Sequence, residues 1–82
     1  MKSTLMAQIA SLPDRENVVY EIFSGTNQVA EISNEPGIGL RIEIFTWTDG
    51  IWDLDLVQFQ EIIENSRKRI GDDLDHKNTP TW

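Results

Sequence analysis

Acidic side chains are the residues of this 82-residue chain whose type and spacing could do chemistry. Glu43, Asp49, Asp53 and Asp55 lie within a short stretch, and paired carboxylates can carry out acid–base catalysis or bind a divalent cation. Their spacing is not that of a calcium-binding loop, and each acid has an ordinary role as a turn residue, an exposed strand residue or a helix cap. The single His76 has no second histidine or cysteine at ligand spacing. We therefore expect no enzymatic activity, no cofactor and no metal site.

The remaining chemical motifs also have structural explanations. No elbow motif or neighbouring base surrounds a serine or threonine, so nucleophilic catalysis is not indicated. Gly37-Ile38-Gly39 lacks the rest of a phosphate-binding loop and is typical of a turn. The cluster Arg67-Lys68-Arg69 stands where basic side chains complement the dipole at the C-terminal end of a helix.

The composition indicates one small acidic domain. A total of 14 acidic residues against 7 basic residues gives a net charge of −7, and there is no cysteine. Because affinity for nucleic acid comes largely from basic contacts to phosphate, we expect no nucleic-acid partner. A basic protein would be attracted, although the charge could equally serve only solubility. No apolar run reaches the roughly 20 residues of a membrane span, and the N-terminus lacks the apolar stretch of a signal peptide, so we expect a cytoplasmic protein with no membrane partner.

The N-terminal segment, residues 3–12, is predicted to be a helix. Leu5, Ile9 and Leu12 recur at helical spacing and would share one face. Pro13 would end this helix, because proline lacks a backbone donor and disfavours helix in the preceding residue.

Four strands are predicted to follow. Residues 17–23, 28–33 and 39–47 are rich in β-branched and aromatic side chains and are separated by turn sequences. A fourth strand is expected after the turn Thr48-Asp49-Gly50, ending at Asp55. Short connections between the strands favour an antiparallel meander.

The register of the last hairpin depends on the length of its loop. A two-residue Asp-Gly loop would pair Trp47 with Trp52 and Ile44 with Asp55, which places a carboxylate on the apolar face. A three-residue loop would instead pair Ile44 with Leu54. Because a slip of one residue exchanges the two faces of a strand, we favour the second register, which keeps carboxylates out of the core.

A second helix is predicted to close the fold, with Asp55 as its N-cap, Gln58 at the capping-box position and Gly71 as its C-cap. The predicted fold class is therefore α+β, a four-stranded antiparallel meander with N- and C-terminal helices packed on one face, in the order α-β-β-β-β-α. Residues 1–71 would form a single domain, and residues 72–82 a polar C-terminal tail.

The face of the sheet opposite the helices is the candidate interface. Aromatic side chains surrounded by carboxylates are typical of a protein docking surface. The alternatives are a solvated sheet face and a homodimer contact. The predicted partner-binding residues on this face are Glu21, Phe23, Glu31, Arg41, Glu43, Phe45, Trp47 and Asp53.

Residues 29–63, VAEISNEPGIGLRIEIFTWTDGIWDLDLVQFQEII, resemble small bacterial immunity proteins found beside polymorphic or contact-dependent toxins. The resemblance lies in the element Ala30-Glu31-Ile32, the strand from Arg41 to Phe45, and the group Gly50, Trp52 and Asp53 before a closing helix. It implies a non-enzymatic protein that binds one cognate toxin domain and blocks it by occlusion. Acidic immunity proteins often face basic nuclease toxins, which suits the net charge of −7. The alternative function is a small self-associating structural or regulatory protein that uses the aromatic sheet face as a homodimer interface.

Overall fold

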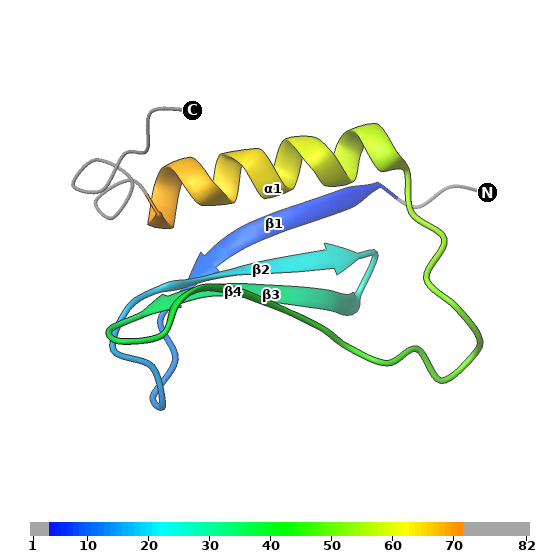
Figure 1. Cartoon of the computed structure of the whole chain (residues 1–82). Coiled ribbons are helices and arrows are strands. Elements are labelled where there is room, and N and C mark those ends of the chain that lie inside the picture. The colour runs from blue at the N-terminus through cyan, green and yellow to red at the C-terminus, as the bar shows by residue number, and fades with distance from the viewer. Residues whose placement is uncertain (1–3, 72–82) are drawn as a thin grey trace.

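The chain folds as a four-stranded antiparallel sheet with one helix on one of its faces (Figure 1). The structure is a computed structural model, and it describes residues 4–71. The strands are β1 (Leu5–Ala10), β2 (Val19–Ser24), β3 (Asn27–Glu35) and β4 (Gly39–Ile44), and the helix is α1 (Leu56–Ile70). The strands lie in the order β1-β2-β3-β4, so the predicted α+β class and the antiparallel meander are confirmed.

The predicted N-terminal helix is wrong, because Leu5–Ala10 is strand β1 and pairs with β2. Leu5 and Ile9 are four residues apart, a spacing that places both on one face of a helix and also on one face of a strand. The competing strand pattern includes Ala7, which packs against the core beside the buried Leu5. A helix of this length is marginal without tertiary support, whereas the open edge of β2 satisfies a whole row of backbone groups.

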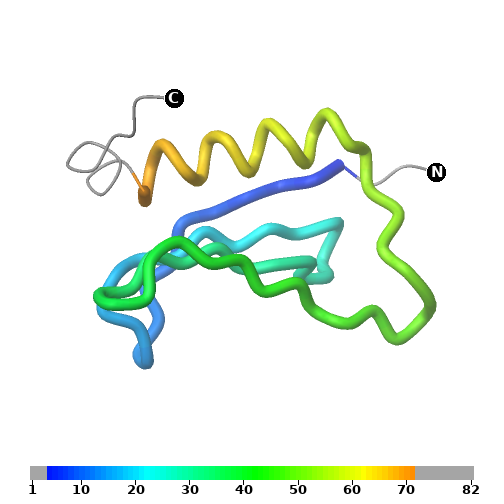
Figure 2. The backbone as a smooth tube through the Cα atoms, viewed as in Figure 1, coloured from blue at the N-terminus to red at the C-terminus, as the bar shows by residue number. Residues whose placement is uncertain are grey.

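The predicted fourth strand before Asp55 is also absent. Residues 45–55 form a loop that leaves the end of β4 and crosses the end of the sheet to reach the start of α1 above β1 (Figure 2). Because this segment must span the width of the sheet, it cannot also pair along β4. Both registers considered for a hairpin around Gly50 are therefore wrong, including the favoured pairing of Ile44 with Leu54.

The loop is held together by its two tryptophans. The rings of Trp47 and Trp52 are stacked with centroids 4.7 Å apart. Trp52 Nε1 donates a hydrogen bond of 2.8 Å to the carbonyl of Phe45, and Gly50 N–H donates to the carbonyl of Trp47 at 3.4 Å. Trp52 and Leu54 also pack against the core, so the loop closes one end of the apolar layer.

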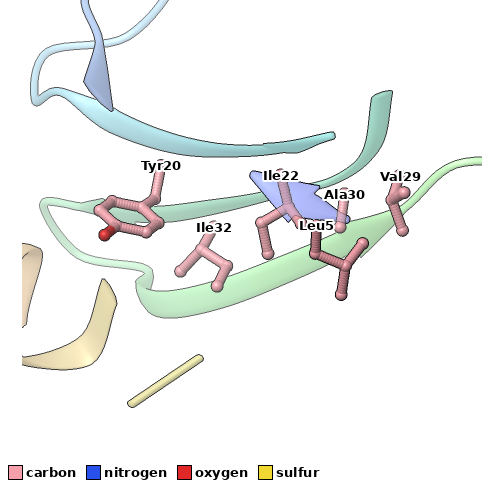
Figure 3. Packing of buried hydrophobic residues seen from close by; sticks show 6 residues of the cluster. All are labelled: Leu5, Tyr20, Ile22, Val29, Ala30 and Ile32. Atoms are coloured by element: carbon pink, nitrogen blue, oxygen red, sulfur yellow. The ribbon is translucent and has the colours of Figure 1, made fainter. Parts of the chain in front are cut away.

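The core lies between the sheet and α1. Its buried side chains come from the first three strands, as Figure 3 shows. They are Leu5, Tyr20, Ile22, Val29, Ala30 and Ile32. From α1, an apolar stripe formed by Phe59, Ile62, Ile63 and Ile70 packs against them. This stripe has the helical spacing expected from the sequence.

Both ends of α1 are closed as the sequence predicts, with one exception. Asp55 Oδ2 accepts a hydrogen bond of 3.0 Å from the backbone N–H of Gln58, which is the N-cap interaction, and Gly71 N–H donates to the carbonyl of Arg67 at 2.8 Å. The side chain of Gln58 does not complete a capping box. Its Oε1 accepts from the N–H of Leu5 at 3.1 Å, and so joins α1 to the start of β1.

Candidate protein-binding face

The face of the sheet that α1 does not cover carries a line of carboxylates across three strands. The strand register places Gln8 opposite Glu21, Glu21 opposite Glu31, and Glu31 opposite Glu43. We call Glu21, Glu31 and Glu43 the carboxylate row. Side chains alternate between the two faces of a strand. Tyr20, the neighbour of Glu21 in β2, points toward the helix-covered core, so the carboxylate row points away from α1.

The side chains of Arg15 and Gln8 donate hydrogen bonds to the carboxylate row. Arg15, from the loop between β1 and β2, donates to Glu31 and also to Glu43 at 2.9 Å. Gln8 Nε2 donates to Glu21 Oε1 at 2.9 Å. The hydrogen bond to Glu43 raises the pKa of Arg15 above its already high ordinary value, so the guanidinium is always charged here. Glu31 is the shielded member, with 9% of its side chain exposed, whereas the Glu43 side chain is 60% exposed.

The charges of this row are not balanced within the described residues. Like charges directly opposite one another on neighbouring strands destabilise a sheet. The row holds two such pairs, Glu21 with Glu31 and Glu31 with Glu43, and Arg15 is the one cation within residues 4–71 that forms an ion pair with it. Residues that lower the stability of a fold and are nevertheless present are expected at functional sites.

An apolar row runs beside the carboxylate row on the same face. Met6 lies opposite Phe23, and both alternate with Gln8 and Glu21 along their strands. Phe45 continues the line of Arg41 and Glu43 beyond β4, where its N–H donates to the carbonyl of Val29 at 2.8 Å. Met6 is 63% exposed, while Phe23 and Phe45 are half-buried. We call Met6, Phe23 and Phe45 the apolar row.

The structure brings most of the predicted interface residues to this face but not all of them. Those on β2, β3 and β4 share it, namely Glu21, Phe23, Glu31, Arg41 and Glu43, with Phe45 following. Trp47 and Asp53 do not belong to the sheet, because the strand predicted to carry Asp53 is part of the loop. Trp47 is half-buried against Trp52 and is therefore a structural residue of that loop.

Three residues of the face were missed by sequence reasoning, namely Met6, Gln8 and Arg15. Met6 and Gln8 are absent from the predicted interface because the apolar spacing of residues 3–12 predicts a helix. The alternation of Leu5, Ala7 and Ile9 could have indicated a strand. Arg15 is recruited by folding of its loop and carries no signal in the local sequence.

The loop that carries Arg15 is anchored at Glu35, at the end of β3. The Glu35 carboxylate accepts hydrogen bonds from the backbone N–H groups of Glu16 at 2.8 Å and Asn17 at 2.9 Å. These two bonds lower the pKa of Glu35 below its ordinary value. Glu35 thus holds the loop in the position from which Arg15 reaches the carboxylate row.

A hollow of about 880 Å³ lies between this loop, the turn after β3 and the end of α1. Asn34 lines it, donating from Nδ2 to the carbonyl of Ile70 at 2.7 Å, while its buried Oδ1 has no partner among residues 4–71. The charged side chains that line the hollow are Glu16, Glu35 and Arg69, and the Glu35 carboxylate is already engaged by backbone N–H groups. The lining does not bring a nucleophilic side chain together with a general base, so the hollow is a weaker candidate for a functional site than the sheet face.

Other kinds of site were sought in the part of the chain that the structure describes. Residues 4–71 contain no group of three or more His, Cys, Asp or Glu side chains placed to hold a metal ion. No helix in that range combines the length and the apolar character needed to cross a membrane. His76 and the predicted tail, including Trp82, lie outside the described residues. Comparisons with protein-family models, curated proteins and solved structures found no match to this chain.

Proposed function

We propose that this chain is a non-enzymatic binding protein whose helix-free sheet face receives a basic protein partner. The observation that carries the proposal is the carboxylate row, in which Glu21, Glu31 and Glu43 face one another across three strands with one guanidinium between them. A lysine or arginine of a partner would relieve the repulsion that folding leaves in place.

The two rows have complementary tasks in such a complex. Glu21 and Glu43 would accept hydrogen bonds from basic side chains, and charge-assisted bonds of this kind are stronger than neutral ones. Met6 and Phe23 would supply the apolar contact that excludes water around them. Binding would act by occlusion, because the face is broad and contributes recognition rather than reactive groups.

The class of partner that we propose is a basic toxin domain, for which this chain would be the cytoplasmic immunity protein. Support comes from the net charge of −7, which would steer association with a basic surface, and from the resemblance of residues 29–63 to small immunity proteins. A homodimer through the same face is less favourable, because two stacked copies would bring their carboxylate rows together.

Charge reversal at the centre of the face tests the proposal. The tagged protein is used to capture partners from a lysate of the source organism at low and at high salt, and the retained proteins are identified by mass spectrometry. Glu21→Lys is then compared with Glu61→Lys, which makes the same charge change on the exposed surface of α1. We expect to capture one basic protein that elutes at high salt. Its affinity for Glu21→Lys should be at least about tenfold weaker than its affinity for Glu61→Lys.

Two results would contradict the proposal. If both variants bind the captured protein as tightly as the parent, the carboxylate row is not the interface. If the captured protein is acidic and its binding does not depend on salt, the electrostatic basis of recognition is wrong. Circular dichroism spectra of both variants serve as the control for folding.

A further inference from the structure

Among residues 4–71, strand β4 is a free sheet edge with apolar side chains left exposed. It is the last strand of the sheet, and α1 packs mainly on β1, β2 and β3 (Figure 1). Toward the helix side, Leu40 is 37% exposed, Ile42 is 39% exposed and Ile44 is 62% exposed. Exposed edge strands are ready templates for pairing with another strand, and proteins usually protect them.

The backbone of β4 presents its free hydrogen-bonding groups at these same residues. Phe45 N–H donates to the carbonyl of Val29, so this pair is hydrogen-bonded across β3 and β4. Because hydrogen-bonded and non-hydrogen-bonded pairs alternate in an antiparallel ladder, Glu43 and Arg41 also bond toward β3. The N–H and C=O groups of Leu40, Ile42 and Ile44 therefore point outward from the sheet edge.

The sequence of β4 is complementary to itself when read in reverse. Its residues 40–44 are Leu-Arg-Ile-Glu-Ile, with Ile42 at the centre. If two copies pair antiparallel around a two-fold axis at Ile42, Arg41 of each copy lies opposite Glu43 of the other. Registers shifted by two residues along the edge would instead oppose Arg41 to Arg41 or Glu43 to Glu43. One register therefore satisfies both the outward backbone groups and the charges.

From this complementarity we propose that two copies of this chain form a two-fold dimer by pairing their β4 edges, with Ile42 on the axis. The two sheets then join into one continuous sheet. Hydrogen bonds form between the two Ile42 residues and between Leu40 of each copy and Ile44 of the other. The interface is isologous, since each copy contributes the same surface.

The same pairing covers the apolar side chains of the edge. On the helix side, Leu40 and Ile42 border a shallow groove of about 180 Å³ against Ile63 and Ser66 of α1. In the dimer, the strips formed by Leu40, Ile42 and Ile44 of both copies lie side by side between the two α1 helices. The opposite face stays open, so the dimer leaves Glu21 and Phe23 available to a partner.

Arg41 has room to form the proposed contact. It is exposed and has no ion-pair partner within residues 4–71. Glu43 is bound by Arg15, but 60% of its side chain remains exposed, and a carboxylate has lone pairs for a second donor.

The other sheet edge, β1, does not offer the same contact. It lies beneath α1 and has no charged side chain (Figure 1).

Charge swaps at the edge test the register. Sedimentation equilibrium over a range of concentrations should show a dimer of the parent chain. R41E places one glutamate opposite each Glu43, so the dimer contains two Glu–Glu pairs, and we expect its dissociation constant to rise by at least about tenfold. E43R should weaken the dimer similarly, whereas R41E/E43R restores opposite charges and should recover it. K68E, the same charge change as R41E on the exposed surface of α1, is the matched control.

Mixing gives a sharper form of the same test. R41E and E43R each oppose like charges in a homodimer, but a heterodimer of the two pairs Glu with Arg at every position. An equimolar mixture should therefore sediment as a dimer at concentrations where each variant alone is a monomer. This result requires residue 41 of one copy to face residue 43 of the other.

Cross-linking provides a measurement that does not depend on Glu43, whose replacement also removes a partner of Arg15. The chain has no cysteine, so I42C introduces a single thiol. Hydrogen-bonded residues opposite one another in antiparallel strands have Cα atoms about 5.5 Å apart, which suits a disulfide. I42C should therefore form a disulfide-linked dimer at least about tenfold faster than M6C, a control on the exposed part of β1.

The proposal is overturned if the parent chain is a monomer at every concentration tested. It is also overturned if R41E dimerises as well as K68E and I42C cross-links no faster than M6C, because another surface would then hold the dimer. Glu21→Lys leaves the edge unchanged and should dimerise like the parent. Failure of the dimer is therefore distinguishable from failure of the partner-binding face.

Discussion

At the scale of single residues, the helix-free face depends on one loop residue that the sequence does not mark. Alternation along residues 39–47 correctly placed Arg41 and Glu43 on one face. The same reasoning could not find Arg15, which reaches Glu31 and Glu43 because its loop folds back along the sheet. A contact between residues distant in sequence can be known only from how the chain folds. Here Glu35 fixes the position of the loop that carries Arg15.

Replacing Glu35 should change the pH dependence of stability. Its pKa is lowered in the folded state, so its stabilisation is present above the ordinary value of 4.5 and is lost as pH falls through the folded value. Glu35→Gln should therefore lower the melting temperature near pH 7 and lose less stability than the parent when acidified below 4.5. Thermal unfolding followed by circular dichroism across this range measures both effects.

Glu61→Gln is the matched control for this prediction, because Glu61 is exposed on α1. The control should keep the acid dependence of the parent chain. Identical melting curves of Glu35→Gln and the parent at pH 7 would show that the two bonds to the Glu16 and Asn17 N–H groups do not stabilise the fold.

At the scale of elements, the sequence predicts α1 well and β1 poorly. A helix of 15 residues repeats its apolar spacing over several turns and carries Asp55 at its start, so local signals agree. Strand β1 has six residues, and Leu5 and Ile9 satisfy both helical and strand spacing. The residues that follow Gly50 show the reverse error, since their alternation suits a strand but the segment must span the width of the sheet to reach α1.

Removal of the N-cap should destabilise the whole domain through α1. Asp55 accepts from the Gln58 N–H, and loss of such a cap costs about 1 kcal/mol. We expect Asp55→Ala to lower the free energy of unfolding in urea by about this amount. Asp53→Ala, an exposed carboxylate in the preceding loop, should change it by less than about 0.5 kcal/mol and is the control. Equal losses in the two variants would contradict the capping role.

At the scale of the whole molecule, one helix on one face of the sheet leaves a thin apolar core. Few side chains are fully buried, and the largest include Ile22, Val19 and Val29. A domain of this size buries only about 60% of its unfolded surface, so its stability is modest. The exposed apolar edge of β4 follows from the same architecture, because a single helix does not span all four strands.

Truncation at the centre of the core should therefore have a large effect. Ile22 is fully buried in the middle of the sheet, and replacing such a residue with alanine costs about 2–5 kcal/mol. We expect Ile22→Ala to lose most of the stability of the domain in urea unfolding. Ile51→Ala, at a residue that is 83% exposed, should unfold like the parent. A small loss for Ile22→Ala would mean that the core is not centred on β2.

By itself, the sequence determined the α+β class, the three successive strands β2, β3 and β4, the capped C-terminal helix and the acidic face around Glu31 and Glu43. Each of these depends on local spacing, turn residues or alternation, which act over a few neighbouring residues. Only the tertiary structure decided that Leu5–Ala10 is a strand, that Trp52 belongs to a loop, and that Arg15 joins the carboxylate row. These outcomes depend on which backbone edge is free and how far the chain must reach, and both are set by residues distant in sequence.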